Sequence, residues 1–193
     1  MYQKYQTEAL ILRSRESGES DRVYTLYTRD FGLVHARASS VRSEISKMRY
    51  ALQSYSHANV SLVRGKRGWR LAGASALQTA HGDPRGVAAF ARIAELTVRL
   101  VQGEGANEYL FAALSEAHRV FMEKYSSQTA VFPTVEVVCV ARLLYALGYI
   151  STEALSTALF THTAYTGESL LEAETMKDTL LLSINKAIAE THL

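Results

Sequence analysis

The sequence is poor in the residues that build cross-links and metal sites. Its 193 residues include one cysteine, Cys139, and two prolines, Pro84 and Pro133. A single cysteine cannot form an intramolecular disulfide, and it cannot supply a zinc site made of several thiolates. We therefore expect Cys139 to be a small buried apolar residue, and we expect neither a metal ion nor a cofactor.

Long apolar runs are also missing. No stretch approaches the roughly 20 consecutive apolar residues that a membrane-spanning helix needs. Residues 1–7 are polar and lack the apolar core of a signal peptide, so we expect a cytoplasmic protein with no membrane partner. Hydrophobic residues make up 48% of the chain and charged residues 21%, which is typical of a folded chain with a buried core.

Patterns typical of catalytic sites are absent from the sequence. No glycine-rich loop precedes a Lys-Ser or Lys-Thr pair, and residues 103–105, Gly-Glu-Gly, are too short for a phosphate-binding loop. None of the six histidines has metal-binding spacing: His35, His57, His81, His118, His162 and His192. A small hydrolase or transferase is therefore disfavoured, and we expect no enzyme activity.

The charge of the chain is distributed unevenly. The net charge is only +2, but residues 1–80 hold 13 Lys and Arg against 6 Asp and Glu, a net charge of +7. Residues 81–193 hold 8 Lys and Arg against 13 Asp and Glu, a net charge of −5. This asymmetry indicates a polyanion-binding face in the first part of the chain, although chance unevenness is the alternative.

The first eighty residues have the pattern of short β-strands. Runs rich in apolar, β-branched and aromatic residues are separated by glycines, and they cover residues 9–12, 23–28, 31–38, 57–63 and 69–74. Residues 30–32 are expected to form a tight turn and residues 64–68 a basic hairpin tip, whereas residues 39–53 are expected to be a long mobile loop. Five short strands predict an antiparallel OB-fold barrel over residues 1–80.

Beyond Pro84 the apolar period becomes helical, which predicts an all-α domain over residues 81–193 and an α+β fold for the chain. Asp83 is a candidate N-cap before Pro84, and Asn107 can cap a second helix. A third helix, opened by Pro133 and ended by Gly148, is apolar nearly all round and is therefore expected to be buried. A short piece over residues 152–159 and a last helix over residues 168–189 complete the expected elements.

The first domain offers the residue types that nucleic acids require. A polyanion binder needs dispersed Lys and Arg, and single strands also stack their bases on aromatic rings. The candidate DNA-binding residues are Arg13, Arg15, Arg22, Arg37, Arg42, Lys47, Arg49, Tyr50, Arg64, Lys66, Arg67, Trp69 and Arg70. The alternatives are that the basic loops serve solubility and that the rings fill the barrel core.

Several of these segments resemble the RecO family of bacterial recombination mediators. The first strand (residues 8–15), the Gly-Glu-Ser-Asp-Arg step (residues 18–22) and the second strand (residues 24–28) occur at the family's spacing. In the helical part, residues 107–114 and the Leu-Leu-Tyr-Ala-Leu-Gly-Tyr run (residues 143–149) are also similar. The resemblance covers roughly residues 5–150, and its most specific part is the first forty residues.

The resemblance implies an OB-fold joined to a helical domain, with binding of single- and double-stranded DNA and annealing of complementary strands. It implies help in placing RecA on DNA coated by single-strand-binding protein, usually with RecR, and a place at the nucleoid. By the family's pattern, Arg37 and Arg42 lie where basic residues touch DNA. Two departures stand out: Ala38-Ser39-Ser40 replaces the usual basic-glycine step, and residues 151–164 lack the cysteines of the family's zinc module.

The family's helical domain is expected to dock the acidic, apolar C-terminal tail of single-strand-binding protein. Such a groove needs a basic group at its edge, and Arg142, which interrupts an otherwise apolar helix, is our hypothesis for that group. The alternative for Arg142 is an arginine that reaches past the core to a surface carboxylate. The alternative for the whole chain is a plain OB-fold module for single-stranded nucleic acid, without mediator activity.

Overall fold

The structure is a computed structural model, and it describes residues 3–43, 46–123, 129–151, 155 and 157–191. The chain forms two compact units. The first comprises Met1–His81 with Gln102–Glu108, and the second comprises Gly82–Val101 with Tyr109–Leu193. The segment that follows the first long helix therefore belongs with the N-terminal unit.

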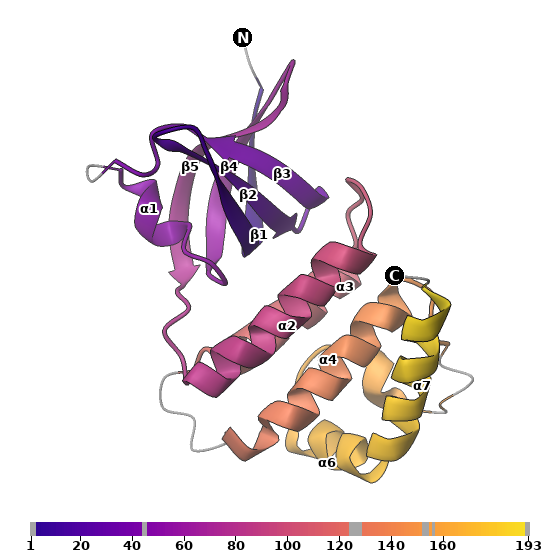
Figure 1. The fold of residues 1–193 in the computed structure, drawn as a ribbon. Helices are drawn as coiled ribbons and strands as arrows, with labels where there is room; N and C mark the ends of the chain where they lie inside the picture. The colour runs from indigo at the N-terminus through magenta and orange to yellow at the C-terminus, as the bar shows by residue number, and fades with distance from the viewer. Residues whose placement is uncertain (1–2, 44–45, 124–128, 152–154, 156, 192–193) are drawn as a thin grey trace. The chain divides into compact units, whose positions relative to one another are not determined.

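The first unit is a closed barrel of five strands (Figure 1). The strands are β1 (Lys4–Ser17), β2 (Asp21–Thr28), β3 (Gly32–Ala38), β4 (His57–Gly65) and β5 (Gly68–Gln78). They confirm the five strands expected from the sequence, although most are longer. The expected long loop after β3 contains a short helix, α1 (Met48–Ala51).

One strand pairing differs from the antiparallel barrel predicted from the sequence. The order around the barrel is β1-β2-β3-β5-β4, and β3 pairs with β5 in parallel. The other four pairings are antiparallel. Three short turns join β1 to β2, β2 to β3 and β4 to β5 as hairpins, whereas the longer connection through α1 joins β3 to β4. This order is that of an OB-fold.

The barrel closes because β1 is long enough to pair with two neighbours. Its first half pairs with β4 and its second half with β2. The register with β2 shifts between Ile11 and Arg13, and such a bulge bends a strand and increases its twist. The bend lets one strand serve both edges of the sheet.

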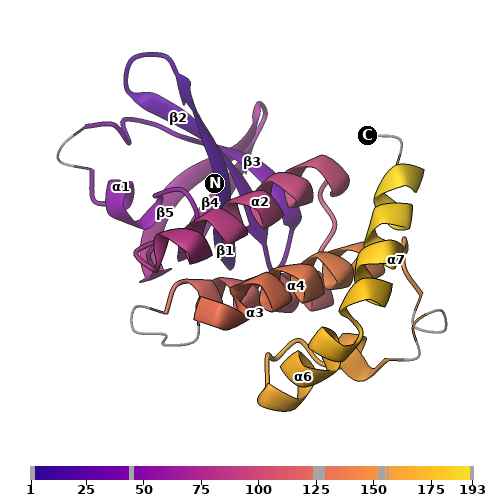
Figure 2. The same ribbon diagram turned by 60° about the horizontal axis from the view of Figure 1, so that its bottom comes forward.

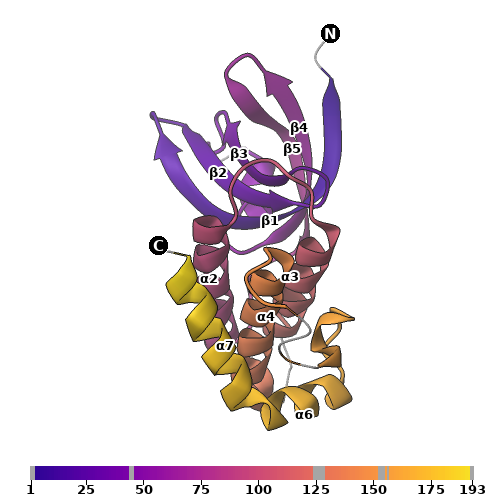
Figure 3. The same ribbon diagram turned by 90° about the vertical axis from the view of Figure 1, so that its right-hand side faces the viewer.

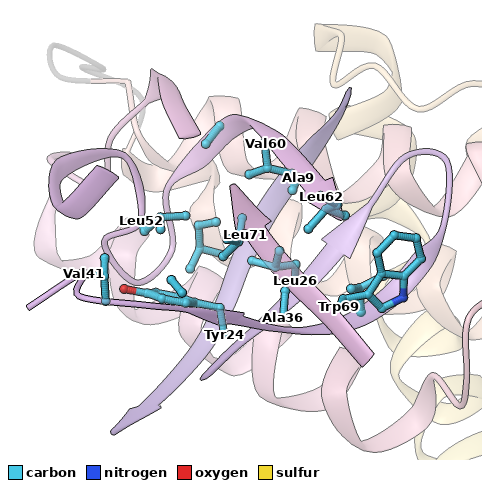
Figure 4. Packing of buried hydrophobic residues seen from close by; sticks show 14 residues of the cluster. Ala9, Tyr24, Leu26, Ala36, Val41, Leu52, Val60, Leu62, Trp69 and Leu71 are labelled. Carbon is cyan, nitrogen blue, oxygen red and sulfur yellow. The ribbon is translucent and has the colours of Figure 1, made fainter. Parts of the chain in front are cut away.

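Alternating apolar side chains from all five strands fill the barrel (Figure 4). Trp69 lies at one end of this cluster, and Tyr24, Val41 and Leu52 lie at the other. The Trp69 ring packs edge-on against Tyr5, with centroids 5.6 Å apart, and its centroid lies 5.1 Å from that of Phe31. The aromatic rings at this end are therefore part of the core.

The turn before β3 depends on a glycine. Gly32 has φ +65°, and a Cβ at this position would lie 2.2 Å from the Gly105 carbonyl oxygen. Only glycine avoids both the strained backbone and the collision. The turn predicted over residues 30–32 is thus confirmed, and it is tied to the segment Gln102–Glu108 of the same unit.

The second unit is helical, as predicted (Figure 2). Its helices are α2 (Pro84–Leu100), α3 (Glu108–Phe121), α4 (Phe132–Ala146), α6 (Gly167–Thr175) and α7 (Lys177–Glu190), with short 3₁₀ turns at Thr129–Val131 and Ala158–Phe160. Asp83 caps α2 by accepting a hydrogen bond from the Arg85 amide, at 2.8 Å. Gly148 ends α4 with φ +81°, while the amides of Gly148 and Tyr149 donate to the carbonyls of Tyr145 and Leu144.

The single last helix expected over residues 168–189 is wrong. The helix breaks at Met176, and Figure 2 shows α6 and α7 as separate helices. Thr166 and Ser169 form a capping box at the start of α6. The short piece expected over residues 152–159 lies partly outside the described residues.

Helix α4 occupies the middle of the second unit, in contact with α2, α6 and α7 (Figure 3). Its buried positions lie on several sides of the helix, which confirms the burial expected from its apolar sequence. Cys139 lies on α4 and is buried, also as expected. None of the helices that the structure describes combines the length and apolarity of a membrane span.

Candidate nucleic-acid interface

Three arginines form a row across the outer face of the barrel. Arg15 of β1 stands opposite Val23 of β2, Val23 stands opposite Arg37 of β3, and Arg37 pairs with Arg70 of β5. All three arginines are exposed. Because neighbouring strands lie about 4.8 Å apart, this basic row (Arg15, Arg37 and Arg70) is a compact line of positive charge.

Arg13 extends the row along β1. It lies two residues before Arg15, and side chains two apart on a strand share a face. Arg13 stands opposite Thr25, which in turn stands opposite His35 of β3. The His35 ring is within hydrogen-bond distance of Thr25 Oγ1, at 3.1 Å. The outer face of β1, β2, β3 and β5 thus carries basic side chains at two successive outward-facing positions along the strands.

A groove of about 470 Å³ adjoins the row between β3, β5 and the β4–β5 hairpin. Arg37 and Arg70 line it from the strands, and Lys66 and Arg67 line it from the two-residue hairpin turn. The basic hairpin tip predicted over residues 64–68 is therefore confirmed as a structure. In OB-folds this face and this loop are where oligonucleotides bind.

Of the carboxylates that the structure describes, only Asp21 lines the groove. It accepts hydrogen bonds from the Ser40 amide at 2.8 Å and from Arg37 Nε at 2.9 Å. The Ser40 amide, and then Arg37, hold the pKa of Asp21 below its ordinary value. Asp21 therefore stays ionised near neutral pH and orients the Arg37 guanidinium.

Several basic residues of the barrel have no ion pair among the residues that the structure describes. These are Arg13, Arg15, Lys47, Arg49, Lys66, Arg67 and Arg70. Of the basic residues predicted to bind DNA, Arg22, Arg37, Arg42 and Arg64 have carboxylate partners. The unpaired cations lie on the row, on the hairpin tip and around α1, so most of the predicted charge is available to a polyanion.

A second group of predicted residues gathers near α1. Arg22, Arg42 and Arg49 line a cavity there, Lys47 is the N-cap of α1, and Tyr50 lies on that helix. Arg22 and Arg42 share Glu16, at 3.6 and 3.4 Å. The Arg49 guanidinium lies 5.9 Å from the centroid of the Tyr50 ring, and Tyr50 is 66% exposed. Tyr50 is thus a ring that could stack on a base.

Trp69 lines the groove but is largely buried, so its predicted stacking on a base stays a prediction. The residue is 5% exposed and belongs to the barrel core. The Arg64 guanidinium lies 5.0 Å from the Trp69 ring centroid and bonds to Glu104 at 2.7 Å. Trp69 therefore belongs mainly to the barrel core, whereas the Arg64 side chain is 60% exposed and is paired with Glu104.

The hypothesis that Arg142 stands at the edge of a partner groove does not agree with the burial of this residue. Arg142 is 1% exposed, and no carboxylate among the described residues pairs with it. Its Nε donates to the Leu159 carbonyl at 2.9 Å and its Nη1 to the Thr163 carbonyl at 2.7 Å. The guanidinium also lies 4.7 Å from the Tyr165 ring centroid. Arg142 fixes the segment after α4 onto that helix.

Sequence reasoning missed Asp21 as a member of the site. The strand pattern of residues 21–28 could have placed Asp21 on the same face as Val23, because strand side chains alternate. The parallel pairing that brings Arg37 beside Arg70 joins residues 33 apart in sequence, and no local pattern signals it.

The described residues offer little for catalysis. They contain no group of three or more His, Cys, Asp or Glu side chains placed to hold a metal ion. Burial raises the pKa of the Cys139 thiol to about 12, so this thiol is not a nucleophile at neutral pH. A further cavity of about 650 Å³ is lined by Glu8, Arg29 and Asp30 among other polar residues, and its acidic balance does not suit a polyanion.

Comparison with known proteins gives matches over the barrel and beyond it. The model of a family described as "Recombination protein O N terminal" matches residues 1–79. A "DNA repair protein RecO" of Heliobacterium modesticaldum is 33% identical over 150 residues, which are 75% of this chain and 52% of that protein.

Two further relatives with the same description match shorter stretches. The protein of Desulfitobacterium hafniense is 44% identical over 62 residues, 32% of this chain and 23% of the relative. That of Dehalococcoides mccartyi is 37% identical over 75 residues, 39% of this chain and 30% of the relative. The chain thus spans about half the length of the Heliobacterium relative and less of the other two.

Proposed function

Because the chain belongs to the RecO family, we propose that it is a DNA repair and recombination protein that binds single- and double-stranded DNA through its barrel. The observation that carries the proposal is the basic row of Arg15, Arg37 and Arg70 beside a groove lined by Lys66 and Arg67. Lys and Arg dispersed along a surface neutralise successive phosphates and release condensed counterions. The proposed function contains no catalytic step.

The contact would be made with the backbone and not with base edges. Arginine side chains on the outer face of a sheet can meet phosphates of either a single strand or a duplex. Tyr50 is the exposed ring near the unpaired Lys47 and Arg49, so it is the candidate for stacking on an unpaired base. Binding would therefore be tolerant of sequence and sensitive to salt.

Annealing would follow from the same charge. A basic face that holds two strands close together screens the repulsion between their phosphates, and base pairing then selects the complementary strand. This property distinguishes the proposal from its alternative. A plain OB-fold module for single-stranded nucleic acid would bind and protect a strand without speeding its pairing.

The finer part of the proposal is help in placing RecA on DNA coated by single-strand-binding protein, usually with RecR. The helical unit would dock the acidic, apolar tail of single-strand-binding protein, and Arg142 is not the contact because it is buried. Leu171 and Leu182 are 71% and 72% exposed, and Lys186 lies one turn after Leu182 on α7, whereas Lys177 is paired with Glu174 at 3.5 Å. This chemistry suits such a tail.

Two measurements test the proposal. Fluorescence anisotropy with a labelled 30-mer in dilute buffer should show saturable binding of both single-stranded and duplex DNA, and absence of binding would refute the proposal. A stopped-flow annealing assay should show faster pairing of complementary strands with the chain present, both for naked DNA and for DNA coated by single-strand-binding protein. Binding without faster annealing would favour the plain OB-fold module.

The tail contact can be tested separately. A tail peptide should bind the wild-type chain, and Leu182→Glu should weaken that binding because it adds a like charge beside an acidic ligand. Ala88→Glu, which adds the same charge at an exposed position of α2, serves as the matched control. Equal affinities for wild type and both variants would remove this surface from the proposal.

A further inference from the structure

A second cavity, of about 300 Å³, lies at the α1 end of the barrel. Arg22, Arg42 and Arg49 line it together with Tyr24, Val41 and Leu52. We call it the end pocket. It is separate from the groove because Asp21 lines the groove while the next residue, Arg22, lines the end pocket, and consecutive side chains of a strand point to opposite faces.

The floor of the end pocket is closed and apolar. Tyr24, Val41 and Leu52 are all buried members of the barrel core. Figure 4 shows these three residues together at one end of the core, with the Tyr24 hydroxyl oxygen directed toward Val41. A closed floor means that a nucleic-acid strand could enter this pocket but could not run through it.

The rim of the end pocket has more positive charge than its own carboxylate can balance. Glu16 forms ion pairs with both Arg22 and Arg42, at 3.6 and 3.4 Å. Arg49 has no carboxylate partner within the described part of the chain. Counted over the described residues, three arginines and one glutamate give this small cavity a net charge of +2.

The end pocket holds a buried hydrogen-bond donor of Arg22 and, beside it, the hydroxyl of Tyr24. The Nε–H of Arg22 is buried, and among the described residues it has no hydrogen-bond partner. Burial raises the pKa of the Tyr24 hydroxyl, with Arg22 acting in the opposite direction. Tyr24 therefore keeps its proton near neutral pH and can donate a hydrogen bond to an anion.

We infer that the end pocket binds the terminal nucleotide of a nucleic-acid strand through its phosphate monoester. An internal phosphodiester carries one negative charge, whereas a phosphate monoester carries about −1.5 to −2 at pH 7, which matches the net charge of the rim. The closed floor admits a strand end, and its apolar surface can lie beneath the sugar or base. The inference rests on the proposed function, because it adds recognition of strand ends to the binding of strands.

The test compares three oligonucleotides that differ only at their ends. Internally labelled 12-mers of thymidine, carrying a 5′-phosphate, a 3′-phosphate or hydroxyls at both ends, are titrated by anisotropy. One phosphorylated 12-mer should bind about tenfold more tightly than the hydroxyl form, as expected for added charge-assisted hydrogen bonds to arginine. The two phosphorylated arms tell which end the pocket accepts.

Matched variants locate the effect. Arg42→Gln with Arg49→Gln removes two exposed arginines of the end pocket and should abolish the preference for the phosphorylated end. Arg13→Gln with Arg15→Gln removes the same charge from the outer face; it should weaken all three 12-mers and keep their ratio. Equal binding of the three 12-mers by the wild type, or a preference that survives in the pocket variant, would overturn the inference.

The two proposals fail in different ways. If the chain binds all three 12-mers equally, the proposed function stands and recognition of strand ends is lost. A titration with thymidine 5′-monophosphate against thymidine, followed by NMR, tests the pocket without strand binding. Saturable binding of the monophosphate alone, lost in the pocket variant, supports the inference; no binding at millimolar concentration contradicts it.

Discussion

The barrel and the helical unit use arginine in opposite ways. On the barrel, Arg15 and Arg70 are exposed and have no ion pair with any described residue. In the helical unit, Arg142 is buried and donates hydrogen bonds to three backbone carbonyls, those of Leu159, Thr163 and Ala164. A guanidinium whose donors are occupied by the main chain holds a fold together, whereas one with free donors can meet a phosphate. The surroundings of an arginine, and not its presence, decide which role it has.

The largest expected effect concerns the buried arginine, Arg142. Arg142→Met should lower the free energy of unfolding by about 3 kcal/mol, because buried carbonyls lose their donors. Urea denaturation followed by circular dichroism measures the change. The affinity of the folded protein for DNA should stay the same. An unchanged unfolding midpoint would mean that Arg142 does not hold the segment after α4.

On the exposed side, the triple variant Arg15→Gln, Arg37→Gln and Arg70→Gln should lose about 100-fold in DNA affinity at low salt, because three phosphate contacts disappear. Anisotropy titration measures it. The matched control is Arg85→Gln, Arg99→Gln and Arg119→Gln, three exposed arginines of the helical unit. Equal losses in both triples would mean that affinity follows net charge alone and not the basic row.

A glycine substitution separates loss of fold from loss of charge. Gly32→Ala should destabilise the chain by about 2 kcal/mol, since the new Cβ meets the Gly105 carbonyl in addition to a strained φ. Gly18 also has positive φ, +76°, but has open space around it, so Gly18→Ala should cost only about 1 kcal/mol. Thermal unfolding measures both. Equal costs would contradict the close approach at Gly32.

The smallest expected effect concerns Asp21, whose pKa is lowered first by the Ser40 amide and then by Arg37. Its stabilising contribution is present above the ordinary value of 3.8 and is lost as pH falls through the lower folded value. Asp21→Asn should therefore be less stable than the wild type at neutral pH, with the difference shrinking at acidic pH. Urea unfolding at several pH values measures this difference. A difference that does not change with pH would contradict it.

The same variant should act in the other direction on DNA. Removing the carboxylate frees Arg37 and lowers the repulsion of phosphates in the groove, so affinity should rise by about two- to fivefold. Lower stability together with higher affinity would identify Asp21 as a residue that orients Arg37 at a cost in binding. Unchanged affinity would mean that the groove does not receive phosphate.

Local patterns predicted the local structure well. Asp83 caps α2, Gly148 ends α4, and residues 64–68 form the basic hairpin, because each depends on only a few neighbouring residues. The parallel pairing of β3 with β5 and the break at Met176 were not predicted. The first depends on barrel closure between distant residues, and the second follows no proline or glycine signal.

Two of the predicted site residues, Trp69 and Arg142, teach a related lesson. Trp69 stands beside basic residues in sequence, but strand alternation turns it inward while Arg70 turns outward. Arg142 interrupts an apolar helix and was therefore assigned to a surface, whereas main-chain carbonyls of a distant segment satisfy it inside the unit. Tertiary structure decides which partners a side chain meets, and local sequence patterns do not specify such long-range contacts.

The most direct test of the account is the salt dependence of oligonucleotide binding by the wild-type chain. If the basic row and groove contact three to five phosphates of a single strand, the logarithm of the binding constant should fall linearly with the logarithm of salt concentration, with a slope of about −2 to −3.5. The triple variant of the row should have a slope shallower by about 2. A flat response, or the same slope in both proteins, would contradict the claim that this face of the barrel binds DNA.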